Sequence, residues 1–139
     1  MTRILVDTGP LVALLNRRDH YHAWVRGMLQ TVEPPMYTCE SVVSEACFLL
    51  RRAIGGPDAV LRLITGAVLR VDFRLASEAE AVQRLMNKFE SVPMSLADAC
   101  IVRMTELDAA SIVLTLDRDF RVYRRNRRQL VPTLMPDGH

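Results

Sequence analysis

The sequence predicts an α/β fold, a three-layer sandwich in which a short central parallel sheet of four or five strands lies between helices. Short apolar runs alternate along the chain with helical patterns, and strands separated by helices pair in parallel. The strand-like runs are apolar throughout, which is typical of a sheet covered on both faces. The chain has 139 residues, 50% of them apolar and 24% charged, so one domain with a sizeable core is expected.

The first half of the chain begins with an apolar run at residues 4–6, which ends at Asp7 and indicates a buried strand. Thr-Gly-Pro follows, a turn that places Pro10 near the first position of a helix. Asp19 is predicted to cap a second helix, which the prolines at 34 and 35 end. The next elements expected are a strand at residues 36–39, a helix capped by Ser41 and continuing to about Ala53, and a helix capped by Asp58 over residues 59–68.

The second half continues the alternation of strands and helices. A brief strand is expected at residues 71–73, and a helix begins at Ser77 and ends before Pro93. Ser95 and Asp98 match the S-x-x-[DE] capping box, so a further helix is expected from there to about residue 107. The last elements expected are a doubly covered strand at residues 111–116 (SIVLTL), a short helix from Arg118, and a strand near residues 131–134.

The charge of the chain is segregated rather than evenly spread. The formal net charge is only +2, which by itself suggests no nucleic-acid partner. Residues 118–128, however, contain six arginines and one aspartate, a net charge of +5, which leaves a net charge of −3 for the rest of the chain. A basic segment on an otherwise acidic body is a candidate binding surface for a polyanion.

The three cysteines and the absence of long apolar segments bear on the compartment. The longest run without a charge is nine residues, 8–16, too short to span a bilayer, and no secretory leader is expected. Cys39, Cys47 and Cys100 lie in apolar surroundings without C-x-x-C spacing. We therefore expect reduced, buried thiols in a cytoplasmic protein.

Four acids from distant parts of the chain are predicted to meet at one edge of the sheet. Asp7 and Asp117 each follow a strand, and Glu45 and Asp98 lie in the opening turns of helices that should begin at the same edge. Their mutual repulsion implies a bound divalent cation. Carboxylate ligands favour Mg²⁺ or Mn²⁺ over Zn²⁺, and such a metal can activate water in phosphodiester hydrolysis.

Each acid also has a structural interpretation. Asp98 can serve only as the capping partner of Ser95, Asp117 can cap the short helix, and Glu45 can complement a helix N-terminus or face solvent. Asp7 is the hardest to explain in this way, because a charge at the end of so apolar a strand needs a partner or a metal. Residue patterns alone leave both interpretations open.

Four segments resemble the motifs of PIN-domain ribonucleases, in the family's order and at its usual separations. These are residues 4–9 (ILVDTG), 41–46 (SVVSEA), 96–99 (LADA) and 114–120 (LTLDRDF). The chain is most similar to VapC-like toxins of bacterial toxin–antitoxin pairs. The similarity covers residues 4 to about 125, so a single PIN-like domain is expected over residues 1–139.

The resemblance implies Mg²⁺- or Mn²⁺-dependent endonucleolytic cleavage of RNA. It assigns the catalytic and metal-binding roles to Asp7, Glu45, Asp98 and Asp117, and supporting hydroxyls to Thr8 and Thr115. Family members differ in which acid of the last motif approaches the metal, and Asp119 is the other candidate here. We favour Asp117 because it directly follows the strand.

The arginine segment is the candidate RNA-binding surface. Arginine binds phosphate bidentately, and backbone contacts of this kind give affinity without sequence preference. We expect the segment to border the cleft because it follows Asp117, although a solvated face or a subunit contact would have the same composition. The residues concerned are Arg118, Arg121, Arg124, Arg125, Arg127 and Arg128, with a weaker case for Arg17–Arg18 and Arg51–Arg52.

Two other functions fit the sequence less well than a nuclease. A haloacid-dehalogenase-like phosphatase needs a second Asp two residues after the first, where Gly9 stands, and a catalytic lysine, for which only Lys88 is available. A PIN fold that only binds RNA or protein would have lost metal ligands, whereas all four acids are present. The partners expected are an RNA substrate, a small antitoxin protein and a second copy of the chain, without membrane contact.

Overall fold

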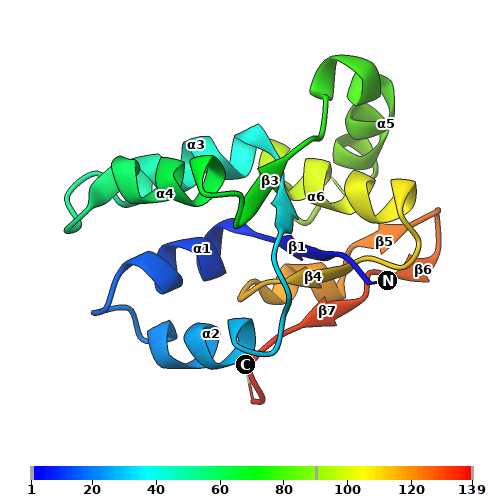
Figure 1. Ribbon diagram of the computed structural model, residues 1–139. Coiled ribbons are helices and arrows are strands. Elements are labelled where there is room, and N and C mark those ends of the chain that lie inside the picture. The colour runs from blue at the N-terminus through cyan, green and yellow to red at the C-terminus, as the bar shows by residue number, and fades with distance from the viewer. Residues whose placement is uncertain (1, 90, 139) are drawn as a thin grey trace.

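The structure is a computed structural model that describes residues 2–89 and 91–138. Its centre is a parallel sheet of five strands in the order β3-β2-β1-β4-β7 (Figure 1). The strands are β1 (Ile4–Val6), β2 (Met36–Thr38), β3 (Leu69–Val71), β4 (Ile112–Leu114) and β7 (Thr133–Leu134). The helices are α1 (Thr8–Leu15), α2 (His22–Leu29), α3 (Glu40–Leu49), α4 (Gly56–Thr65), α5 (Leu75–Lys88), α6 (Leu96–Leu107) and the 3₁₀ helix η1 (Arg118–Arg121).

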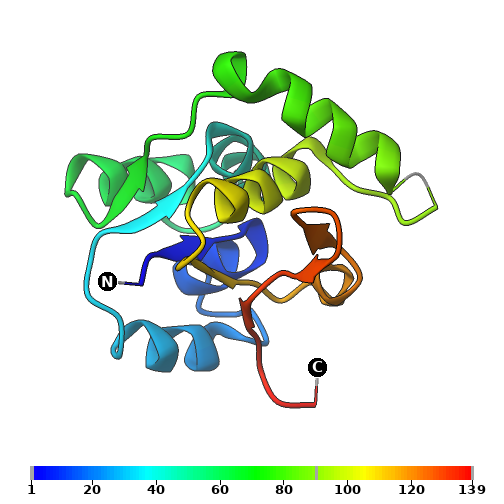
Figure 2. The same ribbon diagram turned by 90° about the vertical axis from the view of Figure 1, so that its right-hand side faces the viewer.

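The predicted three-layer arrangement is confirmed. Figure 2 looks toward the edge of the sheet and shows α2 on one side, with α6 and then α5 on the other. β1 and β4 lie side by side in the middle of the sheet, and Val113 and Leu114 are fully buried. A strand covered on both faces needs apolar residues at every position, which is why this run shows no alternation.

Several predicted helix starts are wrong by a few residues, although the helices themselves are present. The capping box of Ser95 and Asp98 is confirmed, with both reciprocal hydrogen bonds formed. Ser41 does not cap α3, whose N-cap is Cys39, and Asp58 lies in the first turn of α4, where it pairs with Arg62. The helix predicted from Ser77 begins at Leu75, and α2 begins at His22, although the Asp19 carboxylate accepts the Tyr21 N–H just before it.

Two other boundaries move for visible reasons. The helix expected to reach Ala53 ends at Leu49, and the chain then reverses through Gly55 and Gly56, both with positive φ. The strand expected at residues 71–73 lies at Leu69–Val71, because the buried Leu69 pairs with Met36 of β2. These shifts leave the order of the elements unchanged.

The C-terminal region contains a hairpin that the sequence did not predict. β5 (Arg124–Arg125) and β6 (Gln129–Leu130) pair antiparallel and form a small sheet of their own. Asn126 and Arg127 both have positive φ in the connecting turn, and most residues of the hairpin are polar. Without an apolar run there is no strand pattern to recognise.

Two expectations from composition can be compared with the structure. Cys39 and Cys100 are buried, Cys47 is half-buried, and all three are free thiols. Among the described residues, no helix combines the length and the apolar character needed to cross a bilayer.

Candidate active site

The four predicted acids all belong to segments at the carboxyl edge of the sheet. Asp7 follows β1 and is the N-cap of α1, and Asp117 follows β4 and is the N-cap of η1. Glu45 lies in α3, which follows β2, and Asp98 lies in the first turn of α6. Figure 1 shows α1 and α3 extending from this edge in one direction and α6 in the other. The positive ends of α1 and α6 therefore lie at Asp7 and Asp98 and partly offset their charge, whereas Glu45 is the sixth residue of α3 and lies past its first turn.

Asp7 is the most buried of the four acids, with 5% of its surface exposed. Its Oδ2 accepts a hydrogen bond of 2.7 Å from the Thr115 hydroxyl, and its carboxylate also accepts the Thr8 N–H. Burial nevertheless raises the pKa of Asp7 to about 7, and the negative charges of Asp98 and Asp117 add to the rise. A carboxylate in this position is favoured by a nearby cation.

The turn that carries Asp7 packs tightly against the end of β4. A Cβ placed on Gly9 would lie 3.4 Å from the Cβ of Leu116, at van der Waals contact, so the two turns lie directly against each other. The Thr115 hydroxyl links the same turns, since it donates to Asp7 and accepts the Asp117 N–H at 3.0 Å. The predicted supporting role of Thr115 therefore has a concrete geometry.

Asp98 is held by its own helix and by a tyrosine. Its Oδ2 accepts the Ser95 N–H at 3.2 Å and the Tyr123 hydroxyl, also at 3.2 Å. Burial raises the pKa of Asp98, and the charge of Asp117 raises it further. The structural interpretation of Asp98 as a capping residue is correct, and the same residue also lies within the electrostatic reach of the other acids.

Tyr123 is the site residue that sequence reasoning missed. It is fully buried, its ring packs edge-on against Phe120 at 5.3 Å, and its hydroxyl reaches Pro93 O and Asp98. Burial and the charge of Asp98 raise the pKa of Tyr123, so that it stays protonated and remains a donor. Its spacing of three residues after Phe120 is the only sequence signal, and it is a weak one.

Glu45 is the outermost of the four acids. Its side chain is exposed, and its Oε2 accepts a hydrogen bond of 3.1 Å from the Thr8 hydroxyl. Because Thr8 follows Asp7 directly, this bond ties α3 to the start of α1. The hydroxyl of Thr8 is therefore hydrogen-bonded to one of the predicted acids, and its supporting role stays a prediction.

The two acids of the last motif have partly different neighbours. Asp117 raises the pKa of Asp7 and Asp98, and both Asp117 and Asp119 raise the pKa of Tyr123. Asp117 Oδ1 accepts the Asp119 N–H at 2.9 Å, as expected of an N-cap. The choice of Asp117 over Asp119 as the fourth acid stays a prediction.

The donor set fits a hard divalent cation in its chemistry, although not in its present spacing. Within residues 2–89 and 91–138, no three His, Cys, Asp or Glu side chains converge closely enough to enclose an ion. The available groups are carboxylates and hydroxyls, and the buried Asp7 is destabilised in its charged form. Oxygen ligands that leave positions for water are what Mg²⁺ or Mn²⁺ would require.

The arginine segment divides into two parts in the structure. Arg118 and Arg121 are exposed on η1, directly after Asp117. Arg124 is folded back onto main-chain carbonyls at the end of η1, and its Nη1 lies 2.8 Å from Arg121 O. Arg125 donates to Thr105 O and Ala109 O, and so holds the C-terminal end of α6.

The outer part of the segment lies away from the acids. Arg127 and Arg128 are exposed at the turn of the β5–β6 hairpin, which Figure 1 shows on the side of the N-terminus, opposite the carboxyl ends of β1 and β4. α6 has 12 residues and is therefore about 18 Å long, and it separates the hairpin from Asp98. The expectation that the whole segment borders the cleft is therefore wrong for the hairpin.

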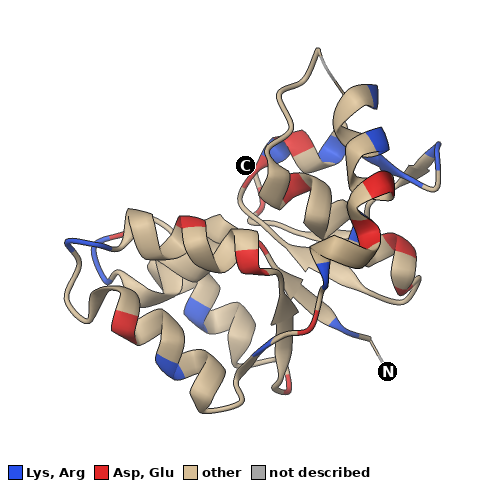
Figure 3. Ribbon diagram, turned by 90° about the horizontal axis from the view of Figure 1, so that it is seen from above, with Lys and Arg blue, Asp and Glu red and all other residues tan. Residues whose placement is uncertain are grey.

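Two other arginine pairs have better positions than expected. Arg17–Arg18 follow α1 and Arg51–Arg52 follow α3, and all four side chains are exposed. Figures 1 and 3 show these two loops at the same end of the molecule, on the side toward which α1 and α3 extend from the acids. They place four exposed positive charges at that end of the molecule.

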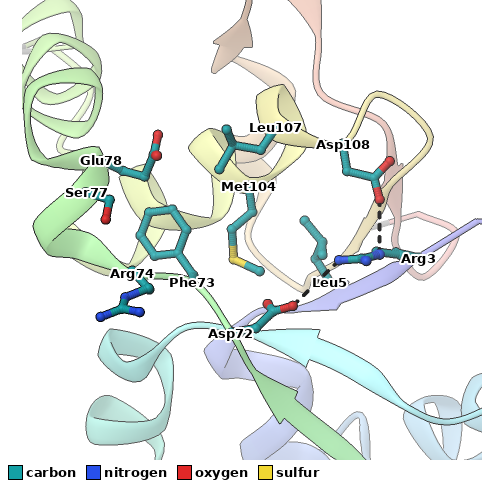
Figure 4. A pocket seen from close by; sticks show the side chains of 10 residues that line it. All are labelled: Arg3, Leu5, Asp72, Phe73, Arg74, Ser77, Glu78, Met104, Leu107 and Asp108. Atoms are coloured by element: carbon teal, nitrogen blue, oxygen red, sulfur yellow. Dashed lines mark ion pairs between the residues drawn. The ribbon is translucent and has the colours of Figure 1, made fainter.

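A separate pocket of about 290 Å³ lies beside the C-terminal end of α6 (Figure 4). Leu5, Phe73 and Met104 line it, and Arg3 at its edge pairs with Asp72 at 3.7 Å and with Asp108 at 3.4 Å. The four predicted acids are not among its lining residues. The pocket is therefore distinct from the candidate active site.

Comparison with known proteins identifies the family. The model of the PIN domain matches residues 4–126, nearly the whole chain. The chain belongs to the PIN domain family. Ribonuclease VapC26 of Mycobacterium tuberculosis (strain ATCC 25618 / H37Rv) is 26% identical over 117 residues, which cover 83% of this chain and 87% of that protein.

Solved structures show that this PIN domain has the fold seen in VapC proteins. The crystal structure of Mycobacterium tuberculosis VapC20, described as a sarcin-ricin loop cleaving toxin, has a TM-score of 0.76 at 22% identity and covers 86% of this chain and 93% of that one. VapBC2 from Rickettsia felis, bound to a DNA fragment from its promoter, has a TM-score of 0.64 at 13% identity and covers 99% of this chain and 100% of the matched chain.

Proposed function

We propose that this PIN domain is a metal-dependent endoribonuclease and the toxin of a toxin–antitoxin pair. The observation that carries the proposal is the buried Asp7, whose pKa burial, Asp98 and Asp117 raise to about 7 at the carboxyl edge of the sheet. A fold without a ligand here would gain stability from a neutral residue at this position. Similarity to Ribonuclease VapC26 supports cleavage of RNA.

Asp7, Asp98 and Asp117 would hold a Mg²⁺ or Mn²⁺ ion, with Glu45 at its outer side, and their side chains would have to draw closer together around the ion than they lie in the structure. Such an ion, when bound, lowers the pKa of a coordinated water and neutralises charge on a phosphate. The protein's own contribution is to aim the carboxylates. Thr115 binds Asp7 Oδ2, and Ser95 and Tyr123 both bind Asp98 Oδ2, so hydrogen bonds from the protein orient both carboxylates.

The RNA backbone would bind exposed arginines that follow the elements carrying the acids. Arg118 and Arg121 follow Asp117 on η1, and the Arg17–Arg18 and Arg51–Arg52 loops lie at the end of the molecule toward which α1 and α3 extend. Arginine in these positions can bind phosphates on both sides of the cleaved bond. Arg127 and Arg128, on the distant hairpin, would reach only a longer RNA.

This division of the arginines predicts different effects on salt dependence. The pair Arg118→Ala and Arg121→Ala should lower kcat/KM on a short oligoribonucleotide and flatten the slope of log K against log salt by about 0.7 for each phosphate that is no longer bound. The pair Arg127→Ala and Arg128→Ala should flatten the slope only for a long structured RNA. Fluorescence anisotropy over a salt titration measures both.

Two exposed arginines elsewhere serve as the matched control for this experiment. Replacing both Arg70 on β3 and Arg84 on α5 by Ala removes the same net charge. If this pair flattens the slope as much as the pair on η1, the effect is one of net charge and the proposed phosphate binding by η1 is wrong. An unchanged slope for the hairpin pair on long RNA would assign the hairpin to a solvated face or a subunit contact.

We further propose that the protein acts in the cytoplasm and is neutralised by a small antitoxin. The Rickettsia felis VapBC2 complex, whose fold is similar over nearly the full chain, supports a partner of this kind. A homodimer is the oligomeric state proposed, and a sedimentation or light-scattering measurement tests it.

A further inference from the structure

Phe48 is exposed to an unusual degree for an aromatic residue. Its exposed fraction is 61%, whereas every other Phe, Tyr and Trp among the described residues is buried or half-buried. An aromatic ring left in water loses the stabilisation that burial would give. Its position therefore calls for a ligand that covers it.

Arg51 is stacked over the Phe48 ring. Its guanidinium carbon lies 4.1 Å from the ring centroid, and its Nη1 donates a 2.8 Å hydrogen bond to Phe48 O. The hydrogen bond fixes the planar guanidinium next to the ring, and Arg52 adds a second exposed charge. Aromatic rings and arginine planes are the groups on which proteins stack unpaired bases of RNA.

Phe48 also lies next to the candidate active site. It follows Glu45 by three residues on α3, so the two side chains occupy neighbouring turns of one helix face. Both are exposed, and the Thr8 hydroxyl ties Glu45 to the start of α1 beside Asp7. A base stacked on Phe48 would thus belong to a nucleotide close to the phosphate held at the acids.

We propose that Phe48 and Arg51 form a stacking subsite for an unpaired base of the RNA, next to the cleaved phosphate. This inference rests on the proposed ribonuclease function and adds a base-binding element to it. Leu49, Ile54 and Leu61 are exposed nearby, and taken alone they would suit a protein partner. The stacked Arg51, the adjacent Arg52 and the proximity of Glu45 favour a polyanion with bases.

Tryptophan fluorescence tests the stacking directly. Phe48→Trp is made in the Asp7→Asn background, which is not expected to cleave RNA. The fluorescence of the introduced tryptophan should be quenched by oligouridylate but not by an abasic oligomer of the same length. Ile54 is fully exposed in the turn that follows α3, and Ile54→Trp is the matched control. Its fluorescence should respond equally to the two oligomers. The parent Asp7→Asn protein corrects for the native Trp24.

Cleavage kinetics provide the second readout. Phe48→Leu keeps an apolar side chain but removes the ring, and we expect kcat/KM on unstructured RNA to fall about tenfold, while Phe48→Trp retains activity. Ile54→Ala should cleave like the wild type. An unquenched Phe48→Trp together with normal cleavage by Phe48→Leu would overturn the subsite.

Two further outcomes distinguish the base-binding subsite from a protein-binding patch and from the nuclease function itself. If Phe48→Leu cleaves normally and Phe48→Asp converts a dimer to a monomer in light scattering, the patch binds protein and the subsite is overturned. If RNA quenches Phe48→Trp but the wild-type protein does not cleave RNA, the base-binding subsite stands and the proposed nuclease function fails.

Discussion

Asp7→Asn is expected to lower the rate of RNA cleavage by about a thousandfold, because it removes the buried carboxylate of the proposed metal site. The substitution keeps the size of the side chain and an oxygen that can accept the Thr115 hydroxyl. Loss of activity should therefore occur without loss of structure. Single-turnover cleavage at saturating Mg²⁺ measures the effect.

The same variant should be more stable than the wild type when no metal is present. The pKa of Asp7 is raised from 3.8 to about 7 in the folded protein, so the folded state binds this proton more tightly than the unfolded chain does. The stabilisation of the folded state by this bound proton is complete below about pH 4, and it is lost as the pH rises through about 7. Asn avoids that loss, and we expect a gain of up to about 4 kcal/mol at about pH 8.

Urea unfolding in EDTA on both sides of this pH range measures the difference. The gap in unfolding free energy between Asp7→Asn and the wild type should widen with rising pH. Asp58→Asn, an exposed acid in the first turn of α4, is the control and should show neither the stability gain nor the loss of cleavage. Equal stability of Asp7→Asn and wild type at the alkaline end would show that Asp7 is not strained in its charged form.

Asp98→Asn is expected to lower cleavage by about a hundredfold and to raise the Mg²⁺ concentration needed for half-maximal rate. Asn can still accept the Ser95 N–H, so the start of α6 should remain intact. Tyr123→Phe removes only the hydroxyl that positions Asp98, and its loss should be about tenfold. Rates measured over a Mg²⁺ titration separate the two effects.

The cleavage rates of Asp98→Asn and Tyr123→Phe, compared with each other, show what Asp98 contributes. If Asp98→Asn retains full activity and an unchanged Mg²⁺ requirement, Asp98 has only the capping role that Ser95 gives it. If Tyr123→Phe loses as much as Asp98→Asn, circular dichroism should be used to check α6, because Tyr123 is fully buried and also bonds to Pro93 O.

The alternation of strands and helices could be predicted because burial dictates it. β1 and β4 are covered on both faces, and their apolar runs are visible without any structure. The capping box of α6 was also predictable, since it requires two residues at fixed spacing. The cap positions of α3 and α4 were not, because Ser41 and Asp58 are better capping residues than Cys39 and Gly55, which hold the N-cap positions.

The sequence named the candidate acids and the hydroxyls of Thr8 and Thr115 that contact two of them, but not the other groups around them. Asp7 and Asp117 follow strands, and a charge at that position is conspicuous in the sequence. Tyr123 and the hairpin arginines were not predictable, since their positions depend on how the chain after η1 packs along α6. Sequence proximity to Asp117 placed Arg127 and Arg128 at the cleft, whereas the chain carries them to the other end of α6.

The requirement for a divalent ion is the central claim, and cleavage of structured RNA by the purified protein tests it most directly. The RNA is incubated with wild-type protein and with Asp7→Asn, in Mg²⁺, in Mn²⁺ and in EDTA. We predict cleavage by the wild type only when metal is present, its recovery when Mg²⁺ or Mn²⁺ is added back in excess of EDTA, and none by the variant. Cleavage that survives both EDTA and Asp7→Asn would contradict the metal site and the role given to the four acids.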